Sequence, residues 1–266
     1  MSEAQAHDAA SILFVGDVVG APGRAALATC LPVLRERHAP TFVVVNGENA
    51  AGGLGITPKV ADEIFALGVD VITLGNHTYH HREVYGYLDS TPNIVRPANY
   101  LRSQPGHGTC VVERAGLKFG VVNLSGNLYL DAGRTAFTEI EVALGEVAGA
   151  DHVLVDMHAE ATSEKVALGW HLDGRVTAVV GTHTHVPTAD ARVLPGGTAY
   201  ITDVGMTGAR ESVIGVRREQ AIESLLTRMS VRFETAAGDP WVMAVLITCS
   251  APRRASAIEQ ILMPAR

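Results

Sequence analysis

The chain has 266 residues, of which 47% are hydrophobic and 18% are charged, and this composition excludes a globally disordered protein. Its formal net charge of −7 argues against a protein that binds duplex DNA, because such proteins use Lys and Arg to neutralise phosphates. A chain of this length can bury a large core without disulfides or a structural metal.

The first third of the chain alternates strand-like and helix-like segments. Three short apolar runs predict strands, and the three segments between and after them predict helices. The expected strands are 11–16, 41–46 and 69–74, and the expected helices are 22–38, 58–67 and 82–88. This alternation is typical of a parallel sheet covered by helices.

The remaining two thirds add hairpin signals, since Ala115-Gly116 and Pro195-Gly196-Gly197 each separate two strand-like runs. The expected strands are 109–114, 117–124, 152–157, 176–181, 191–194, 198–202, 241–250 and 255–263, and the expected helices are 138–147, 163–172 and 217–228. Thr162 is the expected N-cap of the helix at 163–172, and 205–208 is an expected loop. We expect one α/β domain over 1–266, with a parallel first sheet and a more antiparallel second sheet.

The cysteines and the hydropathy pattern indicate where the protein works. Cys30, Cys110 and Cys249 are far apart and no CxxC occurs, so neither a disulfide framework nor a thiolate zinc site is indicated. No apolar stretch reaches the roughly 18 residues of a membrane span, and the N-terminal residues lack the basic region of a signal peptide. We therefore expect a cytoplasmic protein with no membrane partner.

Polar residues follow five of the expected strands directly. The groups are Gly16-Asp17, Gly47-Glu48-Asn49, Gly75-Asn76-His77, His158, and Gly181-Thr182-His183-Thr184-His185. In open α/β sheets, functional sites form beyond the carboxyl ends of the strands. These side chains are therefore expected to converge on one rim, where they would offer oxygen and nitrogen ligands without sulfur.

Each group also has a purely structural interpretation. Asp17 could cap the following helix, and Glu48 could belong to a turn. His158 by itself could be a buried, hydrogen-bonded histidine. His183 and His185 are harder to explain in this way, because residues two apart in an extended segment face the same side. Taken together, the groups favour a cation site over a coincidence.

The glycine-rich segment 16–23 has a competing interpretation as a dinucleotide-binding loop. Its spacing is GxxxGxxG, which differs from both the GxGxxG fingerprint and the P-loop. The carboxylate of Asp17 would also repel a pyrophosphate unless a metal lay between them. A dinucleotide site is therefore not favoured.

The groups Gly75-Asn76-His77 and 181–185, with an isolated His158, resemble the motifs of the calcineurin-like metallophosphoesterases. That family pattern is D-x-H, G-D, G-N-H-D/E, H and G-H-x-H. This chain departs from it, with Val19 in place of the first histidine, Glu48 in place of the second aspartate, and Thr78 after the G-N-H.

The departures resemble one branch of that family, the YmdB-like bacterial phosphoesterases. The supporting segments are FVGDVVGAPGR, VVNGENAAGGLGIT, TLGNHTY, DMHAEATSEK, GTHTHVPTAD and TDVGMTG, which together run from about residue 12 to 216. The resemblance implies a four-layer α/β/β/α sandwich with two mixed sheets and a centre of two divalent metal ions.

The resemblance also implies a ligand set, residue by residue. Asp17, Asn49 and His185 would hold one metal, Asn76, His158 and His183 would hold the other, and Glu48 would bridge them. Asn49 takes the place of the histidine missing from D-x-H, and His77 would be an acid near the leaving group that binds no metal. Ligands without thiolates favour manganese or iron, and the histidines also admit zinc.

The implied activity is phosphodiester hydrolysis, with 2′,3′-cyclic nucleotides as substrates and attack by a hydroxide that bridges the metals. Two alternatives stay open: a general phosphomonoesterase or protein phosphatase, and a non-catalytic nucleotide-binding regulatory module. A homo-oligomer also stays open. Glu160 and Asp203 are either residues that orient the ligand histidines or solvated turn residues. Arg24 either meets the substrate phosphate or lies in solvent.

Overall fold

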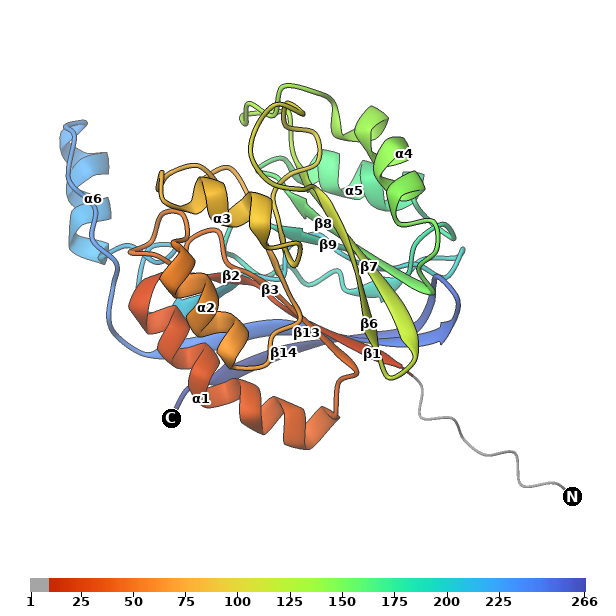
Figure 1. Ribbon diagram of the computed structural model, residues 1–266. Coiled ribbons are helices and arrows are strands. Elements are labelled where there is room, and N and C mark those ends of the chain that lie inside the picture. The colour runs from red at the N-terminus through yellow and green to blue at the C-terminus, as the bar shows by residue number, and fades with distance from the viewer. Residues whose placement is uncertain (1–9) are drawn as a thin grey trace, which may run out of the picture.

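The computed structural model describes residues 10–266, and the segment 1–9, where the sequence shows no signal-peptide pattern, lies outside the described residues. Two β-sheets lie face to face, and helices cover their outer faces (Figure 1). This arrangement confirms the expected α/β fold with two mixed sheets. Among the described helices, none is long and apolar enough to cross a membrane.

The first sheet has eight strands in the order β2-β12-β13-β1-β3-β4-β5, with β14 paired to β13. Its strands are β1 (Ser11–Val15), β2 (Asp17–Val18), β3 (Phe42–Asn46), β4 (Val71–Thr73), β5 (Ile94–Val95), β12 (Met206–Ala209), β13 (Pro240–Ala251) and β14 (Arg254–Pro264). Strands β1, β3, β4 and β5 are parallel, as the alternation of the first third predicts. The long hairpin β13–β14 adds antiparallel pairing next to β1.

The second sheet has six strands in the order β10-β11-β9-β8-β7-β6. Its strands are β6 (Thr109–Arg114), β7 (Leu117–Ser125), β8 (His152–His158), β9 (Ala178–Thr182), β10 (Arg192–Val193) and β11 (Ala199–Ile201). Both expected hairpins form, but they supply only the edge strands. The four central strands are parallel, so the expectation of a more antiparallel second sheet was wrong.

Six helices are described: α1 (Gly20–His38), α2 (Pro58–Ala66), α3 (Val84–Ser90), α4 (Ala136–Glu146), α5 (Thr162–His171) and α6 (Arg218–Thr227). Helices α1, α2 and α3 pack on the first sheet, and α4 and α5 pack on the second (Figure 1). Helix α6 projects from the body of the protein, and Ala221 is its one buried residue.

Three apolar layers hold the four structural layers together. In β1, Leu13 and Val15 face the helices of the first sheet, whereas Phe14 faces the second sheet, because successive side chains of a strand point to opposite faces. Across the middle layer, the rings of Phe42 in β3 and Phe119 in β7 stack with centroids 4.6 Å apart. Burial on both faces explains why these strands are continuous apolar runs.

Several local expectations were wrong in detail. Ala161 occupies the N-cap position of helix α5 and makes no side-chain cap, because Thr162 is already the first helical residue. Helix α4 begins two residues earlier than expected, where the Thr135 hydroxyl accepts a hydrogen bond from the Phe137 amide. The expected loop at 205–208 is largely strand β12, which pairs in parallel with β2. Val19, and not Asp17, precedes helix α1.

The described cysteines form no disulfide. Cys30, Cys110 and Cys249 are all buried with free thiols. Burial raises the pKa of both Cys110 and Cys249 to about 12, which makes these thiols unreactive near neutral pH. They therefore act as small apolar core residues.

Helical glycines provide a test of the packing between α5 and the second sheet. A Cβ at Gly169 would lie 2.5 Å from the buried ring of Tyr200, whereas a Cβ at Gly145 in α4 would meet nothing within 4 Å. We expect Gly169→Ala to destabilise the protein by about 1–3 kcal/mol through overpacking. Gly145→Ala should stabilise it by up to about 1 kcal/mol, because alanine favours the helix. Denaturant unfolding of both variants measures the difference, and equal effects would contradict this account of the interface.

Candidate metal centre

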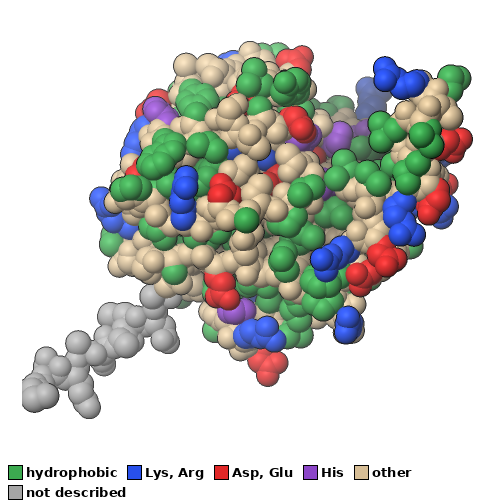
Figure 2. Space-filling view, turned by 180° about the vertical axis from the view of Figure 1, so that it is seen from behind, with side chains coloured by type: hydrophobic (Ala, Val, Ile, Leu, Met, Phe, Trp, Pro, Cys, Tyr) green, Lys and Arg blue, Asp and Glu red, His purple; other side chains and the backbone are tan. Residues whose placement is uncertain are grey.

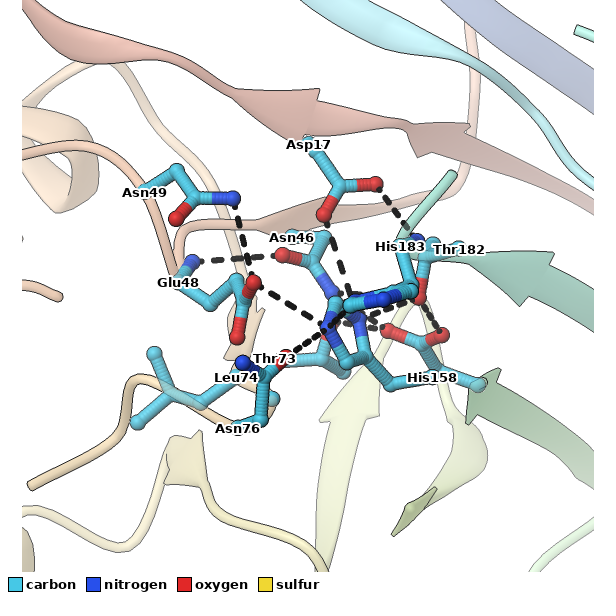
Figure 3. Close-up of polar contacts among 12 residues, drawn as sticks. Asp17, Asn46, Glu48, Asn49, Thr73, Leu74, Asn76, His158, Thr182 and His183 are labelled. Carbon is cyan, nitrogen blue, oxygen red and sulfur yellow. Dashed lines mark hydrogen bonds and ion pairs between the residues drawn. The ribbon is translucent and has the colours of Figure 1, made fainter. Parts of the chain in front are cut away.

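The carboxyl ends of strands from both sheets meet at one place (Figure 3). The first sheet brings Asp17 from β2 and the turns after β3 and β4, and the second brings the ends of β8 and β9. The structure thereby brings all seven predicted ligands together: Asp17, Glu48, Asn49, Asn76, His158, His183 and His185. Their assignment as metal ligands stays a prediction.

One group of side chains surrounds the Nε2 atom of His158. This atom lies 3.0 Å from Asn76 Oδ1, 3.1 Å from Glu48 Oε1 and 3.1 Å from His183 Nδ1. Glu48, His158 and His183 each offer a ligand atom within 4.8 Å of the others. These four residues form the first half of the centre.

The second half lies around His185. Its Nε2 atom is 3.1 Å from Asn49 Nδ2 and 3.8 Å from Asp17 Oδ1. Asn49 Nδ2 also lies 3.0 Å from Glu48 Oε1, so Glu48 contacts both halves. A half-turn of the Asn49 amide would exchange its nitrogen and oxygen and direct the oxygen, which can bind a cation, toward Glu48 and His185.

The two histidines of the last motif lie in an unusual backbone conformation. His183 has φ 98° and His185 has φ 67°, in the left-handed region that non-glycine residues rarely adopt. The expectation that both lie in an extended segment was therefore wrong, because strand β9 ends at Thr182. Both side chains still reach the centre, and the bend is held at its start by the His183 amide, which donates to Asp17 Oδ2 at 3.2 Å. Such strain persists only where the surroundings enforce it.

Gly75 lets the two sheets approach at the centre. A Cβ at this position would collide with Glu48 Oε2 and with the ring of His158. Because glycine has no side chain, the backbone of the turn after β4 can lie directly against both groups.

The electrostatics of the centre suit a cation. Burial raises the pKa of Asp17, whose Oδ1 atom makes no hydrogen bond within the described part of the chain. Burial works in the same direction on Glu48, but the His158 imidazole at 3.1 Å outweighs it and holds the Glu48 pKa well below its usual range. Burial lowers the pKa of His183 to about 3, so this imidazole is neutral and can donate a lone pair. The Asp17 oxygen without a hydrogen-bond partner and the ionised Glu48, beside the neutral His183 imidazole, fit a site for divalent metal ions.

A buried hydrogen-bond relay that sequence reasoning missed orients His158. Its Nδ1 lies 2.8 Å from the Thr182 hydroxyl, which donates to Asp156 Oδ1 at 2.7 Å. Asp156 Oδ2 accepts from Asn46 Nδ2 at 2.9 Å and from the Thr73 hydroxyl at 2.6 Å. The relay places the proton of His158 on Nδ1 and leaves Nε2 for the centre. The sequence does carry a signal for this relay, because its members are polar residues within otherwise apolar strands: Asn46, Thr73, Asp156 and Thr182.

The two predicted orienting acids have different partners. Glu160 Oε2 lies 3.0 Å from His183 Nε2, as expected. Asp203 touches no ligand histidine and instead accepts from the amide and hydroxyl of Thr184, between the two histidines, at 3.1 and 2.8 Å. Its Oδ2 also pairs with the fully buried Lys165 Nζ at 2.7 Å. This ion pair, which sequence reasoning missed, fixes the middle of the His183–His185 bend.

Of the two remaining candidates, Arg24 and His77, only His77 lies at the centre. Arg24 bonds the Ala50 carbonyl and pairs with Glu63, and its contact with substrate stays a prediction. His77 lies at the centre, where its Nδ1 is 2.9 Å from Asn49 Oδ1 and its amide donates to Glu48 Oε2 at 3.1 Å. Asn49 is therefore the side chain that orients His77.

The centre opens into a cavity of about 360 Å³. Figure 2 shows histidine side chains in a hollow beside the projecting α6, with hydrophobic side chains next to them. The polar end is lined by Glu48, Asn49, His77, Glu160, His183 and His185, and the other side by Val19, Leu54, Ile214, Val216 and Phe233, here called the apolar wall. No lysine or arginine is among the described residues that line the cavity.

The Thr182 relay leads to a matched pair of substitutions. Thr182→Val keeps the shape of the side chain but removes the hydroxyl, which frees His158 to take either tautomer. We expect the Mn²⁺ affinity of the Thr182→Val protein to fall roughly 10- to 100-fold. Thr182→Ser keeps the hydroxyl and should stay near the wild-type value. Calorimetric titration of metal-free protein measures the affinities, and a valine variant that binds like the serine variant would refute the relay.

Comparison with known proteins gives a consistent result. The family model described as YmdB-like protein matches residues 13–261. A relative from Bacillus subtilis (strain 168), named 2′,3′-cyclic-nucleotide 2′-phosphodiesterase, is 45% identical over 254 residues, which cover 95% of this chain and 96% of the relative.

Two solved structures are similar over nearly the whole chain. A hypothetical protein from Thermus thermophilus has a TM-score of 0.90 and 41% identity, covering 96% of this chain and 99% of that one. A phosphatase from Mycoplasma pneumoniae has a TM-score of 0.90 and 33% identity, covering 97% and 94%. The chain is therefore a phosphoesterase, a hydrolase that belongs to the YmdB-like protein family.

Proposed function

We propose that this phosphoesterase hydrolyses phosphodiesters, with 2′,3′-cyclic nucleotides as its substrates and two divalent cations in its active site. The observation that carries the proposal is the convergence of seven side chains with oxygen or nitrogen atoms suited to bind a cation, with His77 beside them, at the end of an open cavity. The name of the Bacillus subtilis relative supports the choice of substrate.

The residues divide into two metal sites that share Glu48. Asp17, Asn49 and His185 would hold one cation, and Asn76, His158 and His183 would hold the other. Manganese or iron suits this donor set, and the histidines also admit zinc. When bound, such a pair of cations supplies Lewis-acid polarisation of phosphoryl oxygens and activation of water.

His77 is the proposed general acid. It lines the cavity, and its Nδ1 lies 2.9 Å from Asn49 Oδ1. With the Asn49 amide turned so that its oxygen can bind a cation, its NH₂ group faces His77 Nδ1 and donates to it. The ring proton of His77 then sits on Nε2, from which it can be given to the leaving oxygen. The hydrogen bond to Asn49 keeps the ring at the centre even though His77 itself binds no cation in this assignment.

The charge of the cavity favours diesters over monoesters. Glu48 and Glu160 line it, Asp17 lies behind it, and no described lining residue is a lysine or arginine. Only the cations would then neutralise a phosphate, and a monoanionic diester needs less compensation than a dianionic monoester. The phosphomonoesterase alternative is therefore less favoured by this geometry.

Metal removal tests the proposal directly. Protein stripped by a chelator should not hydrolyse 2′,3′-cyclic AMP or bis(p-nitrophenyl) phosphate, because its acidic cavity repels the phosphate. Titration with Mn²⁺ should restore turnover of both diesters, with saturation at two ions per chain and slower turnover of p-nitrophenyl phosphate. Full activity in stripped protein, or a preference for the monoester, would overturn the proposal.

The role of His77 is tested by varying the leaving group. We expect His77→Ala to keep both metals but to lose roughly 10²- to 10⁴-fold in turnover of 2′,3′-cyclic AMP, whose alkoxide leaving group needs a proton. The loss should be smaller for bis(p-nitrophenyl) phosphate, because p-nitrophenolate leaves without protonation. His80→Ala, at an exposed position outside the cavity, is the control. Unchanged turnover of the cyclic nucleotide by His77→Ala would exclude it as the acid.

A further inference from the structure

The apolar wall is the part of the cavity that the proposed chemistry does not use. Its exposed members are Leu54, Ile214 and Phe233, with 43%, 51% and 52% of each residue accessible. None of these side chains can bind a cation or transfer a proton. Exposed apolar side chains inside a cavity that also holds a few polar groups are typical of a binding site for the apolar part of a ligand.

The apolar wall lies directly beside the candidate metal centre. The Ile214 carbonyl oxygen is 2.8 Å from His185 Nδ1, so the wall and the second half of the centre share a contact. On the other side, the Thr235 hydroxyl donates to the Gly52 carbonyl at 3.2 Å, next to Leu54. When one group of a ligand is bound at the centre, the neighbouring part of the same ligand can therefore contact the apolar wall.

The wall is held in place by backbone pairing at the base of α6. The segments 213–217 and 233–236, which lead into and out of the projecting arm, bond to each other. The Arg217 amide donates to the Glu234 carbonyl at 3.1 Å, and the Ala236 amide donates to the Gly215 carbonyl at 2.9 Å. Phe233 is thus presented by a fixed pair of segments, and a preformed surface binds with a smaller loss of conformational entropy.

We propose that Phe233, flanked by Ile214 and Leu54, is the surface on which the base of the nucleotide substrate stacks. This inference rests on the proposed cyclic-nucleotide activity and extends it to base recognition. In a 2′,3′-cyclic nucleotide, the base is attached to C1′, next to the C2′ that carries the phosphate. The base and the scissile phosphodiester are therefore attached to the same ribose. With the phosphate at the centre, the base would contact the apolar wall, which adjoins His185.

Shape and charge indicate which bases this surface prefers. The cavity volume of about 360 Å³ falls within the roughly 300–1,000 Å³ of small-molecule sites. Aromatic stacking accepts every base, and its strength follows the size of the stacked ring. We therefore expect purines to bind better than pyrimidines. Glu160 at the polar end tolerates a neutral base but repels a further phosphate group.

Tyrosines near Asn76 offer a second aromatic surface, but they serve the fold. Tyr100 is buried, and its hydroxyl donates to the Gly75 carbonyl at 3.3 Å. The Tyr79 hydroxyl donates to the Pro105 carbonyl at 2.7 Å. Phe233 carries no polar group and is half exposed, so its ring is free to stack.

The test compares a nucleotide with a substrate that lacks a base. The metal-loaded protein is assayed with 2′,3′-cyclic AMP and with methyl riboside 2,3-cyclic phosphate, which keeps the sugar and the scissile phosphodiester. Phe233→Ala should raise KM for 2′,3′-cyclic AMP roughly tenfold with little change in kcat. The preference for the nucleotide over the baseless substrate should fall by the same factor, and Phe233→Trp should retain it.

A control and a binding measurement make the result decisive. Leu226→Ala changes an apolar side chain of α6 that is 79% exposed and outside the cavity, and it should leave the preference unaltered. Saturation-transfer NMR with adenosine, which has no phosphate, reports base binding without turnover. An equal loss on both substrates in Phe233→Ala, or adenosine binding that Phe233→Ala does not weaken, would overturn the proposal.

The outcomes also separate this inference from the proposed function. If the wild-type protein hydrolyses bis(p-nitrophenyl) phosphate but neither cyclic phosphate, the cyclic-nucleotide activity is refuted. Adenosine binding that depends on Phe233 would then still support a base-binding surface. If the wild-type protein hydrolyses 2′,3′-cyclic AMP and the baseless substrate with equal KM, the activity stands and the stacking surface is refuted.

Discussion

The hydrogen bonds of the buried Asp156 carboxylate join the two sheets beside the site. Asp156 lies on β8 of the second sheet, and it accepts hydrogen bonds from Asn46 on β3 and Thr73 on β4 of the first. Through Thr182 it also orients His158. Most other contacts between the sheets are apolar, exclude water and give little direction. Asn123 of β7 adds a second directional contact, since it donates to the Leu74 and Val95 carbonyls of the first sheet. Asp156 supplies the directional contacts nearest to the centre.

The same region contains several buried charged groups. Burying a charge destabilises the fold unless the group has an oppositely charged or hydrogen-bonding partner. Burial raises the pKa of Asp156 to about 6 despite its three donors. Asp203 is matched by the fully buried Lys165, whereas Asp17 keeps an oxygen without a hydrogen-bond partner among the described residues. Removing one partner of a buried ion pair costs about 3–5 kcal/mol, so the Lys165–Asp203 pair must stay intact to hold the histidine bend. The unmatched charge lies where the metals are proposed to bind, and their binding would also stabilise the fold.

Local patterns predicted the elements well and their pairing less well. The apolar runs of β1, β3, β7 and β8 were identified because a strand buried on both faces has few polar residues. The short strands β2, β5 and β12 were missed, since two to four residues carry no detectable period and are ordered by their neighbours. The second sheet was expected to be more antiparallel because hairpin signals are visible in sequence, whereas the pairing of β7 with β8 and of β9 with β11 crosses long connections.

The sequence by itself determined which chemistry is available. Seven candidate oxygen and nitrogen ligands and His77 follow strand ends. That placement is local, because a strand and the turn after it are encoded by neighbouring residues. Only the tertiary structure decided how these groups act together. The Asn49–His77 contact, the His183–Asp17 contact, the Asp156 relay and the Phe233 wall all join residues from different segments. Such contacts are set by how the two sheets and the α6 arm pack, and no local pattern in the chain encodes that packing.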